Sequence, residues 1–136
     1  MKITILVGLP GSGKTTLGDQ LVKENGTFLD DFSTNYGLEY LVELVEKKTE
    51  NIVVSDVYLC REISRKNFGL WLEINAPGYK LEWVFFENDP EKCGANVRYR
   101  MAKGDTRKVL GLLSQLSRIY KVPSGCKVIT IYKTEG

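Results

Sequence analysis

The stretch Gly8-Leu9-Pro10-Gly11-Ser12-Gly13-Lys14-Thr15 satisfies the pattern G-x-x-x-x-G-K-[ST]. It lies between a short apolar run, Lys2–Val7, and a run of helical character that begins at Lys14. A strand, a glycine-rich turn and a helix in this order are typical of a phosphate-binding loop. Backbone N–H groups converge there on phosphate oxygens, with no Cβ atoms in the way. A glycine-rich turn that binds no ligand is the alternative.

Each part of this loop has an expected chemical role. The amino terminus of the following helix contributes its dipole. The Lys14 ammonium is expected to neutralise the β- and γ-phosphates, and the Thr15 hydroxyl is placed to ligate Mg²⁺. We therefore expect ATP and Mg²⁺ as cofactors, with nucleotide contacts from Gly8, Pro10, Gly11, Ser12, Gly13, Lys14, Thr15 and Thr16.

Short β-rich runs alternate with helical runs along the rest of the chain, which predicts an α/β fold with a parallel sheet. The predicted strands are Lys2–Val7, Thr27–Leu29, Asn51–Ser55, Leu81–Phe86 and Lys127–Tyr132. The predicted helices are Lys14–Asn25, a segment around 38–45, roughly Arg61–Asn75, Pro90–Ala102 and Lys108–Tyr120. Linkers and repeats are absent, so residues 1–136 are interpreted as one domain.

Composition excludes several classes of protein. The 136 residues contain no histidine, which removes Ser-His-Asp and Cys-His catalysis and every histidine-containing metal site. The three cysteines are isolated in sequence and too few for a zinc site, so we expect them to be reduced and structural. Apolar runs are too short for a membrane helix or a signal peptide. We expect a soluble cytoplasmic protein, or one in the host cytoplasm if it is viral, without a membrane or an obligate protein partner.

Carboxylates follow two of the predicted strands. Asp30 and Asp31 come directly after Thr27–Leu29, and Asp56 comes directly after Asn51–Ser55. Ligands of open α/β sheets lie outside the carboxyl ends of the strands, so all three are expected to line the crevice for the γ-phosphate. In a chain without histidine, a carboxylate is the obvious proton acceptor for a reacting hydroxyl. An Asx-turn at the Asp pair and an N-cap at Asp56 are the structural alternatives.

Positive charge is concentrated in the last third of the chain. Residues 1–91 hold 9 basic and 15 acidic side chains, whereas residues 92–136 hold 10 basic and 2 acidic ones. Three arginines flank Gly104, which predicts a basic lid at about residues 98–108. Arg98 and Arg100 point in different directions on a helix, so we expect Arg100, and second Arg107, to contact phosphates. The alternatives are a solvated basic helix face and surface arginines with screened charges.

Aromatic residues give a weaker signal. Phe32, Tyr36 and Tyr58 follow the carboxylate-bearing strand ends and either stack on an acceptor base or are simply buried. For Phe68, Leu70, Trp71 and Ile74 the default interpretation is core packing along one helix face. The turn Val122-Pro123-Ser124-Gly125 either borders an adenine or is an ordinary turn.

Five stretches of the sequence match motifs of one known family of enzymes, in the same order along the chain. They are Gly8–Thr16, Asp30-Asp31, Val53–Asp56, Phe86–Cys93 with the following Asn96-Val97-x-x-Arg100, and Leu116–Tyr120 before Val122-Pro123. Together they resemble the small P-loop kinases around the kinase domain of polynucleotide kinase, a group that includes phage enzymes. The matches keep their order along nearly the whole chain.

The resemblance implies a P-loop kinase domain with the strand order 2-3-1-4-5 and a P-loop phosphotransferase with an alcohol group as acceptor. It implies Asp30 as the general base, Lys14 and Thr15 as the phosphate and Mg²⁺ contacts, and Asp56 as a second acid that helps to organise the acceptor and the metal-bound water. The expected catalytic residues are Lys14, Asp30, Asp56 and Arg100, and Thr15 is the expected metal ligand.

The expected acceptor is DNA or RNA, but the match is incomplete. Polynucleotide kinase has a basic residue after its Asp pair, whereas Phe32-Ser33 follow the pair here, and a phosphatase domain is absent. The acceptor is therefore either a 5′-hydroxyl or a hydroxymethyl group of a modified base, as in phage-type DNA modification. A kinase for a nucleoside, nucleotide or other small metabolite is the alternative. A nucleotide-binding switch without kinase activity is a third hypothesis.

Overall fold

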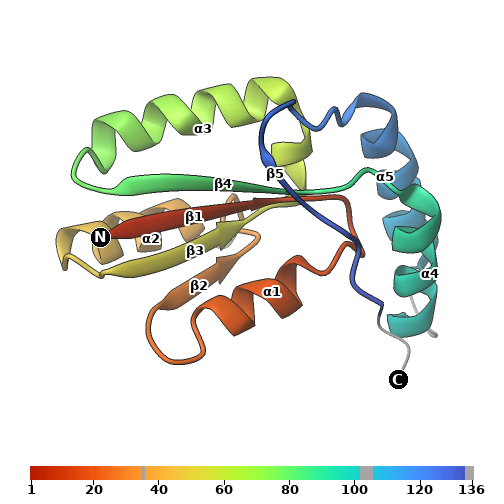
Figure 1. Ribbon diagram of the computed structural model, residues 1–136, viewed down its shortest axis with the longest axis horizontal. Helices are drawn as coiled ribbons and strands as arrows, with labels where there is room; N and C mark the ends of the chain where they lie inside the picture. Colours follow the sequence, from red (N-terminus) through yellow and green to blue (C-terminus); the bar gives the residue numbers. More distant parts are fainter. Residues whose placement is uncertain (35, 102–105, 134–136) are drawn as a thin grey trace.

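The computed structural model of the protein describes residues 1–34, 36–101 and 106–133. Its strands are β1 (Lys2–Val7), β2 (Thr27–Asp30), β3 (Asn51–Ser55), β4 (Lys80–Phe86) and β5 (Lys127–Ile129). Its helices are α1 (Lys14–Leu21), α2 (Gly37–Glu46), α3 (Glu62–Asn75), α4 (Pro90–Arg100) and α5 (Thr106–Ile119), and a short 3₁₀ helix, η1 (Val57–Cys60), follows β3. Figure 1 shows the arrangement of these elements.

The five strands form one parallel sheet in the order β2-β3-β1-β4-β5. The predicted strand order is therefore confirmed. β1 lies in the centre, where Ile3 pairs in register with Ile52 of β3 and with Leu81 of β4. Its residues from Ile3 to Val7 are buried, as expected for a strand covered on both faces.

Alternate residues of β1 enter two separate cores. Ile3 and Ile5 belong to the larger core, which also contains Leu41 of α2 and Leu72 of α3. Leu6 belongs to the smaller core, with Val53 and Val84, against which Leu17 of α1 packs. This division follows from the two-residue period of a strand. α1 and α3 consequently cover opposite faces of the sheet (Figure 1).

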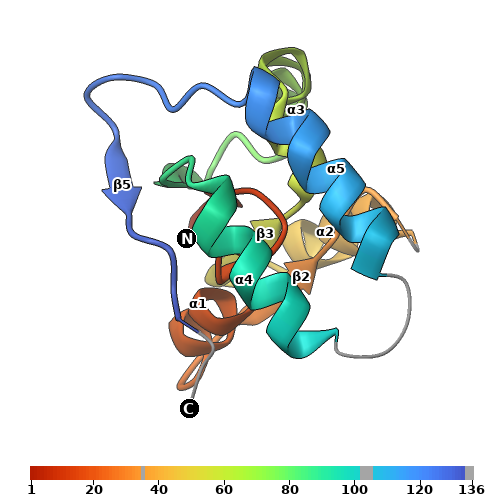
Figure 2. The same ribbon diagram turned by 90° about the vertical axis from the view of Figure 1, so that its right-hand side faces the viewer.

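The helices α4 and α5 lie side by side beyond the carboxyl ends of the strands, as Figures 1 and 2 show from two directions. The Asp89 carboxylate caps α4 by accepting a hydrogen bond from the backbone N–H of Lys92, and Pro90 occupies its first turn. The Thr106 hydroxyl of α5 donates to the Met101 carbonyl at the end of α4. Arg98 and Arg100 of α4 and Arg107 and Lys108 of α5 are thereby brought to the edge of the sheet where ligands bind in open α/β folds.

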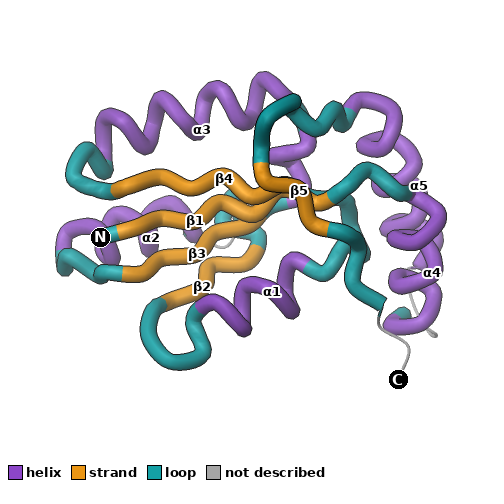
Figure 3. The backbone as a smooth tube through the Cα atoms, viewed as in Figure 1, coloured by secondary structure: helices purple, strands orange, loops and turns teal. Residues whose placement is uncertain are grey.

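The two largest differences from the predicted ends have tertiary reasons, and the other ends differ from the prediction by two residues at most. α1 ends at Leu21 rather than Asn25, because the Asn51 side-chain amide donates to the Leu21 carbonyl at 3.1 Å and the Asn25 carbonyl at 2.8 Å. β5 ends at Ile129 rather than Tyr132, because its partner β4 ends at Phe86. Figure 3 shows the chain after β5 running past the loop between β1 and α1.

The expectation of a single buried face on α3 also needs correction. Phe68 is buried and Trp71 is half-buried, but Leu70 and Ile74 are 57% and 78% exposed. At about 100° per residue, Phe68 and Leu72 share the face that meets the sheet, whereas Leu70 and Ile74 point away from it. Only part of this apolar set therefore packs in the core.

The longest helices of the described residues, α3 and α5, have 14 residues each. A helix that crosses a bilayer needs about 20 apolar residues, and none of the described helices is long and apolar enough. The predicted lid about residues 98–108 is described in part, because Lys103, Gly104 and Asp105 lie outside the described residues.

Candidate phosphate-binding and transfer site

The loop between β1 and α1 forms the floor of a cavity of about 360 Å³ at the carboxyl end of the sheet. Its floor consists of Pro10, Gly11, Ser12, Gly13, Lys14 and Thr15. Asp30, Asp31 and Val57 form one wall, and Val97, Arg100, Met101 and Val109 form the opposite one. The structure thus brings most of the predicted nucleotide contacts together with the predicted Asp pair and Arg100.

Lys14 is the buried charge of this cavity, at 7% exposure. Its ammonium Nζ donates to the Gly8 carbonyl at 2.8 Å, to the Leu9 carbonyl at 2.9 Å and to Ser12 Oγ at 3.4 Å. Burial lowers the pKa of Lys14 from its usual value of 10.5. A cation that is partly stripped of water interacts more strongly with an anion, so the loop holds its lysine ready for a phosphate.

Two glycines allow this loop to close. Gly11 and Gly13 have φ angles of +83° and +107°, which residues with a Cβ rarely adopt. A Cβ on Gly11 would lie 2.4 Å from the Cys93 carbonyl oxygen, and a Cβ on Gly13 would lie 2.8 Å from the Tyr132 ring. The pattern of glycines therefore serves close packing as well as the turn itself.

Two residues that the sequence analysis did not assign to the site, Asn96 and Tyr132, hydrogen-bond to the backbone of the loop. The Asn96 amide donates to the Gly11 carbonyl at 2.8 Å and also to the Tyr132 carbonyl. The backbone N–H of Tyr132 donates to the Ser12 carbonyl at 3.1 Å. The chain leaves the sheet after β5 to make this contact, so α4 and the segment after β5 both fix the phosphate-binding loop. The signal in the sequence is the helical spacing of the polar Asn96 from the apolar Cys93, and the structure buries both residues.

Asp30 lies at the meeting point of three elements. Its Oδ2 accepts a hydrogen bond from the Thr15 hydroxyl of α1 at 2.9 Å, and its Oδ1 accepts one from the Ser55 hydroxyl of β3 at 2.8 Å. β2 and β3 end in register there, since Asp30 pairs with Ser55. A carboxylate is therefore held directly beside the hydroxyl predicted to ligate the metal.

Asp31 differs from its neighbour. Its backbone has a φ of +51°, in the left-handed region that aspartate tolerates better than most residues. Burial, and then the carboxylates of Asp30 and Asp56, raise the pKa of Asp31 above its usual 3.8. The two adjacent acids thus occupy different environments at the same cavity.

Asp56 lines a different cavity and is 2% exposed. Its Oδ1 accepts from the backbone N–H of Tyr58 at 2.8 Å, so it caps η1, as the N-cap alternative predicts. Its Oδ2 accepts from the backbone N–H of Ser33 at 3.0 Å and from the Ser33 hydroxyl. Asp56 therefore ties the end of β3 to the loop after β2.

The three arginines of the predicted lid have separate surroundings. Arg100 lines the phosphate-loop cavity, whereas Arg98 lines a groove between α4 and α5. This agrees with the expectation that residues two apart on a helix point in different directions. Arg107 is exposed in the first turn of α5 and is not among the described residues that line the phosphate-loop cavity. The predicted contacts Gly8 and Thr16 also lie outside this lining, and Gly8 instead accepts from Lys14.

Two of the three cysteines are buried close to Lys14. Cys60 and Cys93 are free and buried, and Cys126 is free and exposed. Burial raises the pKa of both buried thiols to about 12. They are neutral thiols at physiological pH, in agreement with the structural role predicted for them.

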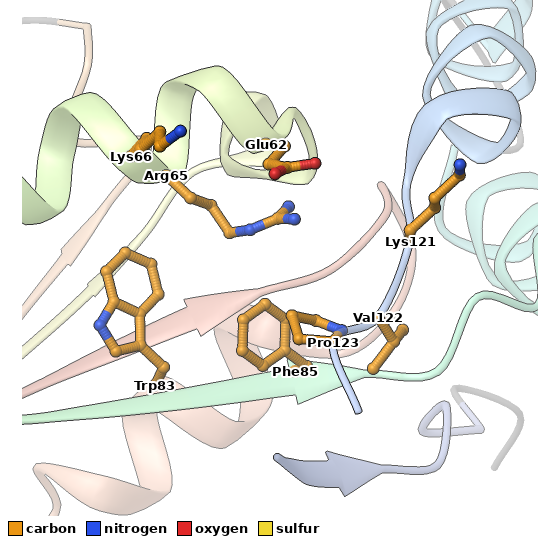
Figure 4. A pocket seen from close by; sticks show the side chains of 8 residues that line it. All are labelled: Glu62, Arg65, Lys66, Trp83, Phe85, Lys121, Val122 and Pro123. Carbon is orange, nitrogen blue, oxygen red and sulfur yellow. The ribbon is translucent and has the colours of Figure 1, made fainter. Parts of the chain in front are cut away.

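A larger cavity of about 450 Å³ lies on the side of α3, between Trp83 and Phe85 of β4 and the segment 121–123 (Figure 4). Arg65 extends over it, but its Nη1 already donates to the carbonyls of Leu59 at 2.8 Å and Cys60 at 3.1 Å. Its guanidinium also lies 5.6 Å from the centre of the Phe85 ring. The central cation of this cavity thus has a structural task, and the phosphate-loop cavity is the better candidate site despite its smaller volume.

A third cavity, of about 270 Å³, lies between α2, η1 and α3, and we call it the aromatic cavity. Its apolar lining is Phe32, Leu38, Tyr58, Leu59, Phe68 and Trp71, and its polar lining is Ser33, Asp56, Ser64 and Asn67. Phe68 stacks on Phe32 at 4.4 Å and on Trp71 at 6.0 Å between ring centres. Tyr36, the other aromatic residue considered for stacking, is 79% exposed.

Comparison with known proteins extends these observations. None of the known protein families matches the sequence as a profile. An uncharacterised protein of Acanthamoeba polyphaga mimivirus is 29% identical over 139 aligned positions, which cover 97% of this chain and 98% of that protein.

Solved structures share the architecture at low sequence identity. A gluconokinase from Sinorhizobium meliloti 1021 superposes with a TM-score of 0.60 at 17% identity, over 97% of this chain and 83% of that one. A sugar kinase from Janibacter sp. HTCC2649 gives 0.61 at 16% identity, over 96% and 84%. Kti12 from Chaetomium thermophilum, in complex with ADP-AlF3, gives 0.59 at 15% identity, over 94% and 88%. Together with the strand order and the loop between β1 and α1, these likenesses show that the chain has the α/β fold of the P-loop kinases.

Proposed function

We propose that the protein is a kinase that transfers the γ-phosphate of ATP to a hydroxyl group of a nucleic acid. The observation that carries the proposal is the position of Asp30, which lies between the hydroxyls of Thr15 and Ser55. Where a loop only binds or hydrolyses a nucleotide, one carboxylate beside it assists the metal, whereas here a second acid, Asp31, lines the same cavity. A carboxylate pair next to a phosphate-binding loop is suited to a reaction with an acceptor.

The residues of the cavity fit a magnesium-bound nucleotide. The loop directs a buried ammonium, backbone N–H groups and the start of α1 at the same space. The Thr15 hydroxyl, which donates to Asp30 at 2.9 Å, offers an oxygen ligand of the kind that Mg²⁺ prefers. Bound Mg²⁺ and ATP would supply the transferable phosphoryl group and offset its charge. Thr15 would hold the metal, and Lys14 would hold the phosphates.

The acid pair provides the chemistry on the acceptor side. In the proposed reaction Asp30 accepts the proton of the acceptor hydroxyl as its oxygen bonds to the γ-phosphorus and the bond from that phosphorus to ADP breaks. Asp31, whose pKa is raised, lines the same cavity and is the competing candidate for this role. Arg100, on the opposite wall, is placed to stabilise the charge on the transferring group.

The choice of a nucleic acid rests on the distribution of charge. Arg100 of α4 lines the cavity, and Arg98 of α4 with Arg107 and Lys108 of α5 are exposed on the same two helices. A polyanion gains from such a group of cations, whereas a neutral metabolite does not. This supports DNA or RNA as the acceptor over a small alcohol.

The proposal is tested by incubating the protein with γ-labelled ATP and a panel of DNA, RNA, nucleosides, nucleotides and polyols. We expect labelled oligonucleotide to be the main product, and none with Lys14→Ala. Label found only on mononucleosides or polyols would establish a small-molecule kinase instead. Release of labelled inorganic phosphate without any labelled acceptor would favour the nucleotide-binding switch.

A further inference from the structure

The aromatic cavity adjoins the phosphate-loop cavity through two shared chain segments. In the loop after β2, Asp30 and Asp31 line the phosphate-loop cavity, and the next residue, Phe32, lines the aromatic cavity. After β3, Val57 lines the first cavity, while its neighbour Tyr58 lines the second. A molecule in the aromatic cavity therefore lies next to the acid pair, on the side away from α4 and α5.

The lining of the aromatic cavity selects the chemistry of its occupant. Three of its rings form a stacked row, Phe32 on Phe68 and Phe68 on Trp71. The carboxylate of Asp56 is already bonded to Ser33 and Tyr58, so its acceptor capacity is largely used within the protein. Phe32 and Phe68 are buried, so the half-buried Trp71 at the end of the row has the accessible ring face, and such a face favours a flat π-system.

A polyol is a poor occupant of this cavity. Each buried hydroxyl without a hydrogen-bond partner is destabilising, and the lining offers mainly Ser64 and Asn67 as uncommitted polar side chains. The Asn67 amide has a donor and an acceptor side by side, which matches the edge of a nucleobase. The fold is shared with a gluconokinase and a sugar kinase, but apolar side chains outnumber the polar ones in the lining of this cavity.

The size of the cavity agrees with this choice. Its volume of about 270 Å³ is at the lower limit of ligand pockets, which span roughly 300–1,000 Å³. One planar ring system fills such a space, whereas a base pair does not fit.

We infer that the aromatic cavity holds the base of the acceptor nucleotide, with Trp71 against its face and Asn67 at its edge. This inference rests on the proposed kinase function, since it places the acceptor relative to the acid pair. It assigns Trp71 and Asn67 as specificity-determining residues and makes a single unpaired base the recognised unit.

A binding experiment without ATP tests the inference independently of catalysis. The chain has two tryptophans, so Trp83→Phe leaves Trp71 as the only one. Titration of this variant with a short oligothymidylate is expected to quench its fluorescence, and titration with gluconate is not. The matched control, Trp71→Phe, retains Trp83 and should show no quenching with either. Absence of quenching in Trp83→Phe, or equal quenching by gluconate, would overturn the inference.

A kinetic experiment tests the role of Asn67, which is exposed at the cavity and so is replaceable without loss of a buried contact. Asn67→Ala should raise KM for an oligonucleotide about tenfold, as expected for a lost base-edge contact. KM for ATP should stay within about twofold of the wild type, because substitutions that do not contact the ATP site change it little. Asn67→Gln should recover part of the loss, and Glu73→Ala, exposed on the same helix, should change nothing.

The outcomes separate the two proposals. If the wild type phosphorylates gluconate but no acceptor with a base, the kinase stands and the base site is wrong. If nothing is phosphorylated while oligothymidylate quenches Trp71 fluorescence, the base site stands and the kinase is wrong. An unchanged oligonucleotide KM in Asn67→Ala would remove Asn67 from the recognition of the base.

Discussion

The phosphate-binding loop and the helices α4 and α5 line the same cavity, but they hold their cations in opposite ways. Lys14 is buried and donates to three groups of its own loop. Arg100, in the last turn of α4, is exposed and lines the cavity from the other side. One charge is fixed before any ligand arrives, and the other is held on a solvent-exposed side chain.

This difference indicates a division of labour. A buried, prepositioned cation binds the ground state of a phosphate with little loss of conformational entropy. An exposed arginine loses side-chain entropy when it engages, so it is better suited to a charge that develops during the reaction. The loop should therefore govern both nucleotide binding and turnover, whereas α4 should govern mainly turnover.

The strongest test removes the fixed cation. Lys14→Ala should lower kcat by on the order of 10³-fold or more, because no other buried cation faces the phosphates among the described residues. The melting temperature should fall modestly, because the Lys14 ammonium also donates to the Gly8 and Leu9 carbonyls of its own loop. Labelled-phosphate transfer and thermal melting measure the two effects, with Lys23→Ala, an exposed lysine just after α1, as the control. Full activity with a normal melting curve would contradict the role assigned to the loop.

The next test separates the two acids. Asp30→Asn should lower kcat by roughly 10²- to 10⁴-fold, the usual contribution of a general base, while ATP affinity stays near normal. Single-turnover transfer and equilibrium ATP binding distinguish the two quantities. If ATP binding collapsed in Asp30→Asn while Asp31→Asn bound ATP and lost transfer, the two roles would be reversed.

The role of the exposed cation, Arg100, is tested by comparing it with Arg98 on the same helix. Arg100→Ala should lower kcat by about 10²-fold, as for loss of one donor to a developing charge. Arg98→Ala is the matched control, because Arg98 lines the groove between α4 and α5 instead. Arg107→Ala should fall between them. Equal losses in Arg98→Ala and Arg100→Ala would indicate a general effect of charge rather than a contact with the phosphates.

A smaller effect is expected for Lys108, which does not line the phosphate-loop cavity. Binding of an oligonucleotide should weaken with salt, with a logarithmic slope of roughly −0.7 to −0.9 for each phosphate contact. Lys108→Ala should reduce that slope by about one and raise the acceptor KM with little change in KM for ATP. The second lysine of this prediction, Lys103, lies outside the described residues. A KM that is independent of salt for every acceptor would contradict binding of a polyanion.

The smallest expected effect concerns the contribution of Asp31 to the stability of the fold. Because the pKa of Asp31 is raised in the folded state, its ionisation destabilises the fold as pH rises through that folded value. Asp31→Asn should therefore increase the melting temperature at neutral pH, and asparagine tolerates the left-handed backbone there. Below the usual carboxyl pKa of 3.8 the two proteins should melt alike. A gain that persisted undiminished in acid would show that charge is not its cause.

Much of the fold was predictable because it depends on short-range pattern. The β-branched runs, the glycine pattern at 8–13 and the period of the helices act within windows of a few residues, and β1 and β3 have the predicted bounds. The Asp pair was likewise predictable as part of the site, because strand ends meet at one edge of a parallel sheet.

Contacts between distant segments were not predictable in this way. The Asn51 amide that ends α1 and the Asn96 amide that joins Gly11 to Tyr132 each act across more than one element. Which residue of the Asp pair meets Thr15, and how Phe32, Phe68 and Trp71 come to line one cavity, likewise depend on how strands and helices pack.

The amino-acid sequence by itself therefore determined the phosphate-binding loop, the alternation of strands and helices, and the presence of acids at their ends, because backbone sterics and hydrophobic periodicity are local. The tertiary structure alone decided the partners of Asp30 and Asp56, the separation of Arg98 from Arg100, and the aromatic cavity beside the acid pair. These depend on directions and distances between side chains far apart in sequence, which only close packing of the whole chain fixes.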